Sequence, residues 1–279
     1  MGPGAEPIRI EEPEFAGLGM SMRAISRVTG VARNTIDKLL VDLGTACAEY
    51  QDGALANLST TRVEADEIWS FTYAKQKNVP EDFKDTPGYG DVWTWTAIDA
   101  DTKLVPSWLV GERTQRDCYV FLADLRSRIK PGHRIQLTTD GLALYERTVA
   151  ALWGNNIDYT TLHKVYSGTT DTEQRQYSPA VCTGIDKRVM AGDPDMDLAS
   201  TSYVERNNLT MRMGMRRFTR LTNGFSKKIE NHAHAVSLHM LHYNFARPHL
   251  TLGKRVTPAM AAGIERHPWS LTQIAELLD

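Results

Sequence analysis

Residues 62–74 read RVEADEIWSFTYA, and the interpretation of the whole chain starts from this stretch. Apolar and β-prone residues flank Asp66 on both sides, which is typical of a buried strand. Side chains alternate along a strand, so Glu67 is expected to point to the face opposite Asp66. The stretch therefore predicts a first strand that holds one carboxylate in a protected setting.

Clear local signals follow this strand. Residues 91–112 contain two β-prone runs around a turn at 99–103, which predicts a hairpin. Thr114 is a suitable N-cap for a helix whose apolar residues recur at helical spacing. The next predicted elements are a strand at 134–140 that ends on Asp140, a helix at 142–152 and a strand at 157–166.

Residues 167–202 are polar and rich in Gly, Thr and Asp, so they are predicted to form a long loop or insertion. Residues 202–218 have the apolar spacing of a helix, on which Glu205, Asn208 and Arg212 share one face. The order of strands and helices is that of the ribonuclease H-like fold. We therefore expect an α/β protein with a mixed five-stranded sheet flanked by helices.

In such a sheet the first and fourth strands are neighbours, and the last helix packs across their ends. Asp66, Asp140 and Glu205 are therefore expected to converge. Three carboxylates in one place repel each other unless a cation neutralises them. Carboxylate oxygens suit Mg²⁺, and two such ions can activate an attacking oxygen and stabilise a leaving one. Glu64, Glu67, Asp99 and Asp101 are set aside, since alternation or turn placement is expected to turn them away.

An N-terminal helical pair precedes the first strand. Ser21 is a suitable cap for the first helix, Gly30 for a tight turn between the two helices, and Gly44 for the end of the second. This is the pattern of a helix-turn-helix, although an ordinary helical hairpin gives the same signal. The second helix would present four polar residues to a major groove: Arg33, Asn34, Thr35 and Lys38.

Four regions follow from these patterns. Residues 1–18 are predicted to be a flexible N-terminus, and residues 19–60 a helix-turn-helix-like DNA-binding segment with its connector. Residues 61–250 form the catalytic core with its insertion at 167–202. Residues 251–279 are expected to be a C-terminal tail with short helices.

Composition excludes several classes of protein. With 279 residues and 42% apolar content, the chain can bury a full core. The three cysteines are widely spaced and odd in number, so the sequence offers neither a disulfide framework nor a CxxC zinc site. The first residues are acidic and rich in Pro and Gly, so we expect no export signal, and no run of about 18 apolar residues occurs. We expect a protein of the reducing cytosol that does not enter membranes.

Charge is unevenly distributed along the chain. The net charge is −2, yet residues 205–255 hold ten Lys and Arg against two acidic residues, a net charge of +8. Such a stretch is often a solvated face, but directly after Glu205 it is suited to track DNA phosphates.

Five blocks carry a resemblance to a known family: ADEIWSFTYAK, GDVWTWTAIDADTKLVPSWLVG, QLTTDG, STSYVERNNLTMRMGMRRFTRLTNGFSKKIENHAHAV and YNFARPHLTLGKRVTPAMAAG. Together they resemble the DDE transposases of bacterial insertion sequences. The likeness is strongest to the insertion-sequence-one type and, near the C-terminus, to the integrase core pattern Tyr-Asn-x-x-Arg-Pro-His…Thr-Pro. It covers roughly residues 20–265.

The resemblance implies that Asp66, Asp140 and Glu205 are the catalytic and metal-binding triad of a DNA transposase. It implies Mg²⁺ as the cofactor, with Mn²⁺ as a substitute. The partners would be double-stranded DNA, at the element's terminal inverted repeats and at the target, and further copies of the chain in a dimer or higher oligomer. Such a protein is expected in the bacterial cytoplasm, associated with the nucleoid when bound to DNA. The residues expected to contact DNA, beyond those of the helical pair, are Arg212, Arg216, Arg217, Arg220, Lys227, Lys228, Asn244, Arg247 and His249.

Several alternatives stay open. A ribonuclease H-like nuclease would cut strands without joining them, and a transposase-derived regulator would bind DNA without catalysis. The family often carries an N-terminal Cys-rich zinc module, and this sequence contains none. His232, His234, His239 and His242 suggest a zinc site, but their spacing does not keep them on one helix face. Asn244, Arg247 and His249 either line a DNA channel or mark a helix end at Pro248.

Overall fold

Strand β1 lies at the centre of the protein, between an antiparallel and a parallel neighbour. The computed structural model describes residues 20–166, 182–219 and 224–279. Its sheet has the strand order β3-β2-β1-β4-β5-β6, in which β1 pairs antiparallel with β2 and parallel with β4. The strands are β1 Arg62–Thr72, β2 Gly90–Asp99, β3 Ser107–Gly111, β4 Gln136–Asp140, β5 Asp158–Tyr166 and β6 Cys182–Ala191.

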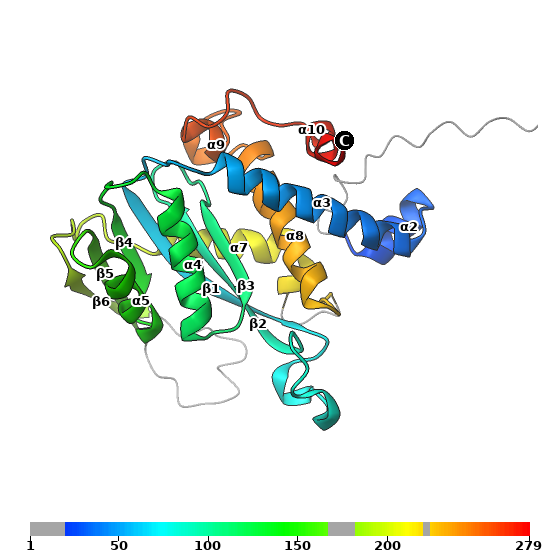
Figure 1. Ribbon diagram of the computed structural model, residues 1–279, viewed down its shortest axis with the longest axis horizontal. Helices are drawn as coiled ribbons and strands as arrows, with labels where there is room; N and C mark the ends of the chain where they lie inside the picture. The colour runs from blue at the N-terminus through cyan, green and yellow to red at the C-terminus, as the bar shows by residue number, and fades with distance from the viewer. Residues whose placement is uncertain (1–19, 167–181, 220–223) are drawn as a thin grey trace, which may run out of the picture.

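Helices cover both faces of this sheet (Figure 1). Helices α4, Gln115–Arg128, and α5, Ala143–Trp153, pack on one face around a core that includes Trp95. Helices α7, Ser202–Gly214, and α8, Ile229–Leu241, pack on the other face around Ile68. The arrangement is the ribonuclease H-like α/β fold predicted from the order of elements.

Most of the predicted elements are confirmed. The turn after β2 is built by Asp99, whose Oδ1 accepts hydrogen bonds from the backbone of Asp101 and Thr102 at 2.8 and 2.9 Å. Thr114 caps α4 by accepting a hydrogen bond from the Asp117 amide at 3.2 Å. Local turn and cap chemistry was therefore sufficient to predict these boundaries.

The expected five-stranded sheet is wrong by one strand. Residues 182–191 of the predicted insertion form β6, which pairs antiparallel with β5. Most of its side chains are exposed, because it is the edge strand of the sheet. A strand that buries neither face lacks the alternation of apolar and polar residues by which strands are recognised. The predicted flexible N-terminus at 1–18, residues 167–181 of the insertion and Arg220 lie outside the described residues.

The N-terminal helical pair is α2, Met22–Thr29, followed by α3, Arg33–Ala54. Ser21 caps α2 and Gly30 ends it with a φ of 74°, as predicted. Gly44 does not end the second helix, which continues for ten more residues to Ala54. A Cβ at Gly44 would lie 2.5 Å from the Cβ of His234. The glycine therefore allows α3 and α8 to pack closely instead of terminating a helix.

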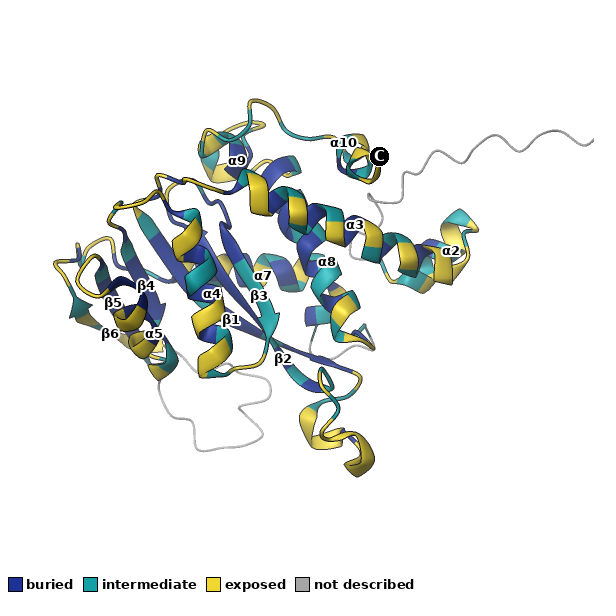
Figure 2. Cartoon of the chain, in the orientation of Figure 1, coloured by how far each residue is buried: buried dark blue, intermediate teal, exposed yellow. Residues whose placement is uncertain are grey.

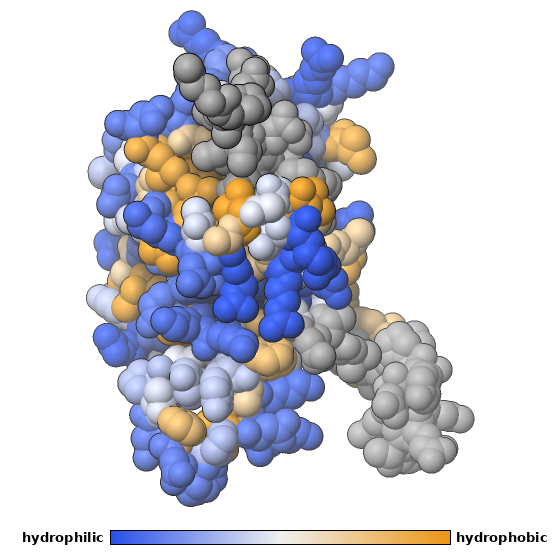
Figure 3. Space-filling view, turned by 90° about the vertical axis from the view of Figure 1, so that its right-hand side faces the viewer, coloured by the Kyte–Doolittle hydropathy of each residue, from blue (hydrophilic) through white to orange (hydrophobic). Residues whose placement is uncertain are grey.

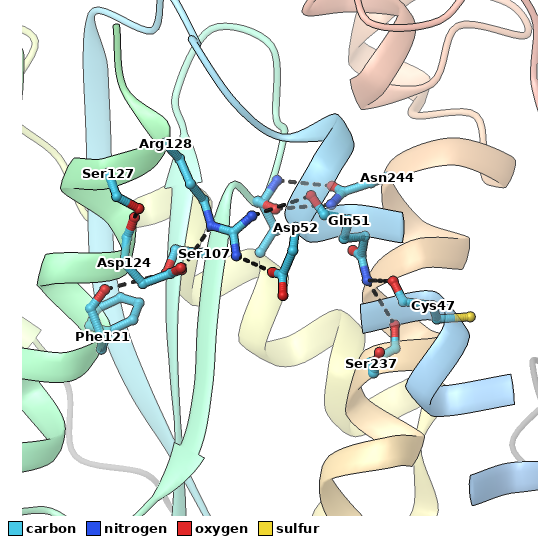
Figure 4. Close-up of polar contacts among 11 residues, drawn as sticks. Cys47, Gln51, Asp52, Ser107, Phe121, Asp124, Ser127, Arg128, Ser237 and Asn244 are labelled. Atoms are coloured by element: carbon cyan, nitrogen blue, oxygen red, sulfur yellow. Dashed lines mark hydrogen bonds and ion pairs between the residues drawn. The ribbon is translucent and has the colours of Figure 1, made fainter. Parts of the chain in front are cut away.

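Polar contacts fix the C-terminal half of α3 to the core (Figure 4). The Arg128 guanidinium on α4 donates to Asp52 at 2.5 Å and to the Gln51 carbonyl at 3.3 Å. Gln51 in turn donates to the Ser237 carbonyl of α8 at 3.3 Å. Since α3 is continuous, these contacts also orient its N-terminal half and α2. That end projects beyond the sheet and is largely exposed (Figure 2).

The C-terminal residues pack against the same region. The short helices α9, Pro258–Ala261, and α10, Leu271–Ala275, bury Ala259 and Ile274 in a third core with residues of α3 and α8. Within the described ranges, no helix combines the length and apolar character needed to cross a bilayer.

Candidate metal centre

Asp66 and Asp140 lie together because β1 and β4 are parallel neighbours. The last paired residues are Ala65 and Thr139, so the two aspartates occupy the next position of each strand. Together with Glu67 they form a group in which one carboxylate oxygen from each residue lies within 4.8 Å of the others. Convergence of the first two predicted acids is therefore a consequence of strand register.

Glu67 was expected to point away, and its backbone position does lie on the opposite face. Its carboxylate nevertheless belongs to the group, with an oxygen within 4.8 Å of an oxygen of each aspartate. The carboxylate accepts a hydrogen bond from the Tyr145 hydroxyl at 3.2 Å and pairs with Arg113 at 2.5 Å. Strand alternation predicts the face of a Cβ, and it does not fix the position of a carboxylate two bonds further out.

The electrostatics of this group fit a cation. Burial raises the pKa of Asp66 to about 6, and the neighbouring Asp140 charge adds to the effect. Burial likewise raises the pKa of Glu67 to about 7, with contributions from Asp140 and Asp66 that Arg113 partly offsets. Buried acids whose charges repel one another are a favourable set of hard oxygen ligands for a divalent ion.

These shifts lead to a pH-dependent effect of metal on stability. Asp66 and Glu67 have higher pKa values in the folded protein than their values near 4 in the unfolded chain. Their protonation therefore favours the folded state, and this contribution to stability is fully present below about pH 4. That contribution is lost as pH rises through 6 to 7, where a cation would bind the deprotonated carboxylates. We expect Mn²⁺ to raise the melting temperature more at about pH 8 than at about pH 5.5, measured by scanning calorimetry against EDTA.

A double variant provides the control for this measurement. Asp66→Asn combined with Asp140→Asn should reduce the Mn²⁺ effect at both pH values, because the two aspartates on the neighbouring strands lose their charge. An equal rise in melting temperature at both pH values in the parent protein would contradict a metal site at these carboxylates.

Helix α7 contacts this group through Asn208. The amide Nδ2 of Asn208 donates to Asp66 Oδ2 at 2.8 Å, while its Oδ1 accepts a hydrogen bond from Thr96 at 3.3 Å. Asn208 lies three residues after Glu205, on the helix face that the sequence spacing had identified. The Asn208 amide thereby orients the Asp66 carboxylate at the metal centre.

Glu205 lies nearby but outside this group. Its charge contributes to the raised pKa of Asp66. One oxygen of its carboxylate accepts hydrogen bonds from Lys164 on β5 and from Thr201, the latter at 2.6 Å. The structure therefore brings together two members of the predicted triad and holds the third beside them, paired with a lysine.

Glu64 positions the helix that carries Glu205. It is buried on β1, two residues before Asp66 and on the same face. Its Oε2 accepts hydrogen bonds from the backbone amides of Tyr203 and Val204 at 2.8 and 3.0 Å. Helix α7 has no side-chain cap of its own at Thr201, so this carboxylate satisfies its first amides. Sequence reasoning discarded Glu64, although its two-residue spacing from Asp66 was the signal that could have identified it.

The predicted DNA-contacting residues of the helical pair are at the surface. The Ile36 and Leu40 side chains of α3 are buried, whereas four neighbouring side chains on the helix are exposed: Arg33, Asn34, Thr35 and Lys38.

The basic segment after Glu205 is divided between surface and interior. Arg216, Lys227 and Lys228 are exposed, and Arg212 is half-buried on α7. Arg217 is directed inward, where its Nη1 donates to Ser226 at 2.6 Å. The same Ser226 hydroxyl lies 2.9 Å from Nδ1 of the buried His232. Arg217 therefore joins this segment to α8.

The C-terminal candidates also differ in exposure. Arg247 is exposed and His249 is half-buried. Asn244 is fully buried in a π-helical turn, His242–Ala246. Its amide donates to the Val105 carbonyl and accepts from the Val105 amide, both at 2.9 Å. The Asn244 side chain is therefore held inside the protein.

The histidine cluster forms no metal centre among the described residues. Burial lowers the pKa of His232 and of His239 to about 3. Both imidazoles are consequently neutral at physiological pH, and they lie on a helix that packs against the sheet and α3.

No family model matches this sequence, and no curated protein matches it. Among solved structures, the Mos1 mariner paired end complex with Mn is 11% identical, with a TM-score of 0.29 over 86% of this chain and 78% of that chain. A pre-cleavage Mos1 transpososome is 11% identical, with a TM-score of 0.27 over 86% and 79% of the two chains. The Mos1 strand transfer complex is 11% identical, with a TM-score of 0.24 over 86% and 77%. These values are low, and the fold assignment depends on the strand order and pairing of this chain.

Proposed function

We propose that this protein is a DNA transposase of a bacterial insertion sequence, which cuts phosphodiester bonds at the element's ends and joins them to target DNA. The observation that carries the proposal is the meeting of Asp66 and Asp140 on parallel neighbouring strands, beside the helix of Glu205. Phosphoryl transfer to water or to a 3′-hydroxyl requires positioning and charge stabilisation, without a nucleophilic side chain.

Asp66, Asp140 and Glu205 would hold divalent cations, Mg²⁺ or Mn²⁺. When bound, such ions lower the pKa of water and stabilise a departing 3′ oxygen. For Glu205 to join the other two acids in holding a cation, its carboxylate would have to leave Lys164. Asn208 keeps Asp66 oriented during this change, since it bonds the carboxylate from the same helix.

The helical pair would recognise the ends of the element. Its exposed residues lie on a helix that Arg128 and Gln51 anchor in the core, so DNA bound there has a fixed orientation relative to the carboxylates. The side of the molecule that carries α2 and the start of α3 is hydrophilic over its middle part and has several apolar groups in its upper part (Figure 3). Because two ends must be joined in one event, the working form would be a dimer or higher oligomer on DNA.

The decisive experiment uses purified protein, Mg²⁺ or Mn²⁺, and duplex DNA from the sequences that flank the gene. A transposase yields cleaved ends and a covalently joined product on denaturing gels. Cleavage without any joined product would indicate a ribonuclease H-like nuclease instead. Binding of the same DNA without cleavage would indicate a regulator, and either result would overturn the proposal.

Substitutions in α3 test DNA recognition separately from catalysis. The Arg33→Ala/Lys38→Ala variant should bind the end DNA more weakly, because it loses two positive charges that contact phosphates. Each lost contact should also lower the slope of log affinity against log salt concentration by about one unit. The measurement is fluorescence anisotropy over a salt series. The control is Arg126→Ala/Lys130→Ala, which removes two exposed charges near the end of α4. Equal effects of the two double variants would contradict a specific role for α3.

A further inference from the structure

The loop between β3 and α4 carries an arginine beside the metal centre. Arg113 pairs through Nη2 with Glu67 Oε1 at 2.5 Å, and Glu67 shares the carboxylate group with Asp66 and Asp140. The Glu67 side chain is 2% exposed, whereas that of Arg113 is 39% exposed. The guanidinium therefore extends from a buried acid to solvent at the edge of the carboxylate group.

The orientation of this arginine is fixed from several sides. Its guanidinium carbon lies 4.7 Å from the centroid of the Trp93 ring, a cation–π contact that adds to the ion pair. Glu67 is itself held by the hydroxyl of Tyr145, which is completely buried. The partner of Arg113 thus has little freedom to move.

The loop backbone is held just as firmly. The amide of Glu112 donates to Asp117 at 2.6 Å, and its carbonyl accepts a hydrogen bond from the buried Trp95 indole at 3.1 Å. A Cβ at Gly111 would lie 2.5 Å from the Asp117 carboxylate, so the loop approaches α4 as closely as glycine permits. These contacts anchor the loop before Arg113, and the Thr114 cap of α4 anchors it after Arg113, so the arginine is preorganised before any substrate binds.

An arginine needs neither this exposure nor this many supports to neutralise one carboxylate. Its planar guanidinium has five N–H donors in a fork that matches phosphate oxygens, and the ion pair with Glu67 uses one nitrogen. A phosphodiester brought to Asp66 and Asp140 by metal would lie beside the exposed edge of this fork. Arginine keeps its charge at any physiological pH, so the donors are always available.

We infer that Arg113 contacts a non-bridging oxygen of the DNA phosphodiester at the metal centre, and that Glu67 positions Arg113 for this contact. The inference rests on the proposed function and adds to it a substrate-binding residue outside the three acids. Glu67 acts through the arginine, while Trp93 contacts the arginine and Tyr145 donates to Glu67.

Single methylphosphonate substitutions near the cleaved bond test the contact. A methylphosphonate removes the charge of one phosphate, and the parent protein should be slowed most at the position that Arg113 contacts. In Arg113→Gln, single-turnover cleavage should fall about 100-fold, the scale of a lost transition-state donor, with no additional slowing at that position. The matched control Arg116→Gln, at an exposed arginine in the first turn of α4, should retain the parental pattern.

A double-variant comparison tests the part played by Glu67. If Glu67 acts through Arg113, then Glu67→Gln should slow cleavage in the parent and have little further effect in Arg113→Gln. Additive losses, together with a higher Mn²⁺ requirement, would show that Glu67 ligates metal and would overturn its positioning role. Glu112→Gln, an exposed acid of the same loop, is the control for loss of charge.

Measurements of DNA affinity test the Arg113 contact independently of the proposed transposase activity. If the parent protein cleaves no DNA, the transposase proposal fails, and the phosphate contact is then judged from affinity for the same duplex in Ca²⁺. Arg113→Gln should lower the salt slope by about one unit relative to Arg116→Gln. Equal slopes, or an unchanged methylphosphonate pattern in a cleaving protein, would overturn the contact.

Discussion

Asp140→Asn is expected to abolish metal-dependent DNA cleavage and joining while the protein stays folded. Asp140 lies at the end of β4, in one group with Asp66 and Glu67. The asparagine keeps an oxygen that can accept the Leu142 amide, which Asp140 Oδ1 now bonds at 3.0 Å. It removes the charge required to bind a cation, and such ligands supply several kcal/mol of transition-state stabilisation. We expect a loss of at least about a thousandfold in single-turnover rate.

The control for this variant is Asp85→Asn, which neutralises an exposed acid between β1 and β2 that is not a member of the carboxylate group. It should cleave and join DNA at the parental rate. Circular dichroism would check that Asp140→Asn is folded, and a Mn²⁺ titration should show weakened binding. Parental activity of Asp140→Asn would exclude the proposed site, whatever the protein does with DNA.

Asn244→Ala is expected to cause the largest loss of stability among the residues that sequence reasoning assigned to DNA. Both amide atoms of Asn244 bond the backbone of Val105, and both residues are completely buried. Alanine would leave a buried amide and a buried carbonyl without these partners, at about 1–3 kcal/mol for each group. We therefore expect the free energy of unfolding to fall by roughly 2–6 kcal/mol, measured by urea denaturation.

The neighbouring Arg247→Ala provides the contrast, because Arg247 is exposed three residues further along. It should leave the urea midpoint nearly unchanged and weaken DNA binding if the predicted channel exists. The opposite result, a stable Asn244→Ala protein with reduced DNA affinity, would show that this amide serves DNA and that the bonds to Val105 contribute little.

Local sequence signals predicted most of the fold because they act within a few residues. Ser21, Gly30 and Thr114 perform the cap and turn roles that their chemistry indicated. The same local reasoning failed at Gly44, which resembles a helix end and is instead the contact with His234 on a helix almost two hundred residues later. Whether a glycine ends a helix or admits a neighbour depends on packing, which a local window does not contain.

The sequence-based predictions failed for an edge strand, for a long acidic side chain and for a buried arginine. Strand β6 was missed because an edge strand with mostly exposed side chains shows no apolar alternation. Glu67 was set aside on alternation, although its carboxylate lies within 4.8 Å of those of Asp66 and Asp140. Arg217 shares the basic composition of its neighbours, and its direction toward Ser226 follows from packing against α8.

The order of strands and helices, their caps and turns, and the setting of Asp66 and Asp140 on two β-prone runs could be predicted from the amino-acid sequence. These features depend on residues close together in the chain, where propensity and periodicity act. The tertiary structure decided which acids meet: strand register joins Asp66 to Asp140, side-chain reach adds Glu67, and an ion pair with Lys164 holds Glu205 aside. The physical reason is that carboxylate contacts across a sheet edge depend on register and reach between distant segments, which no local pattern encodes.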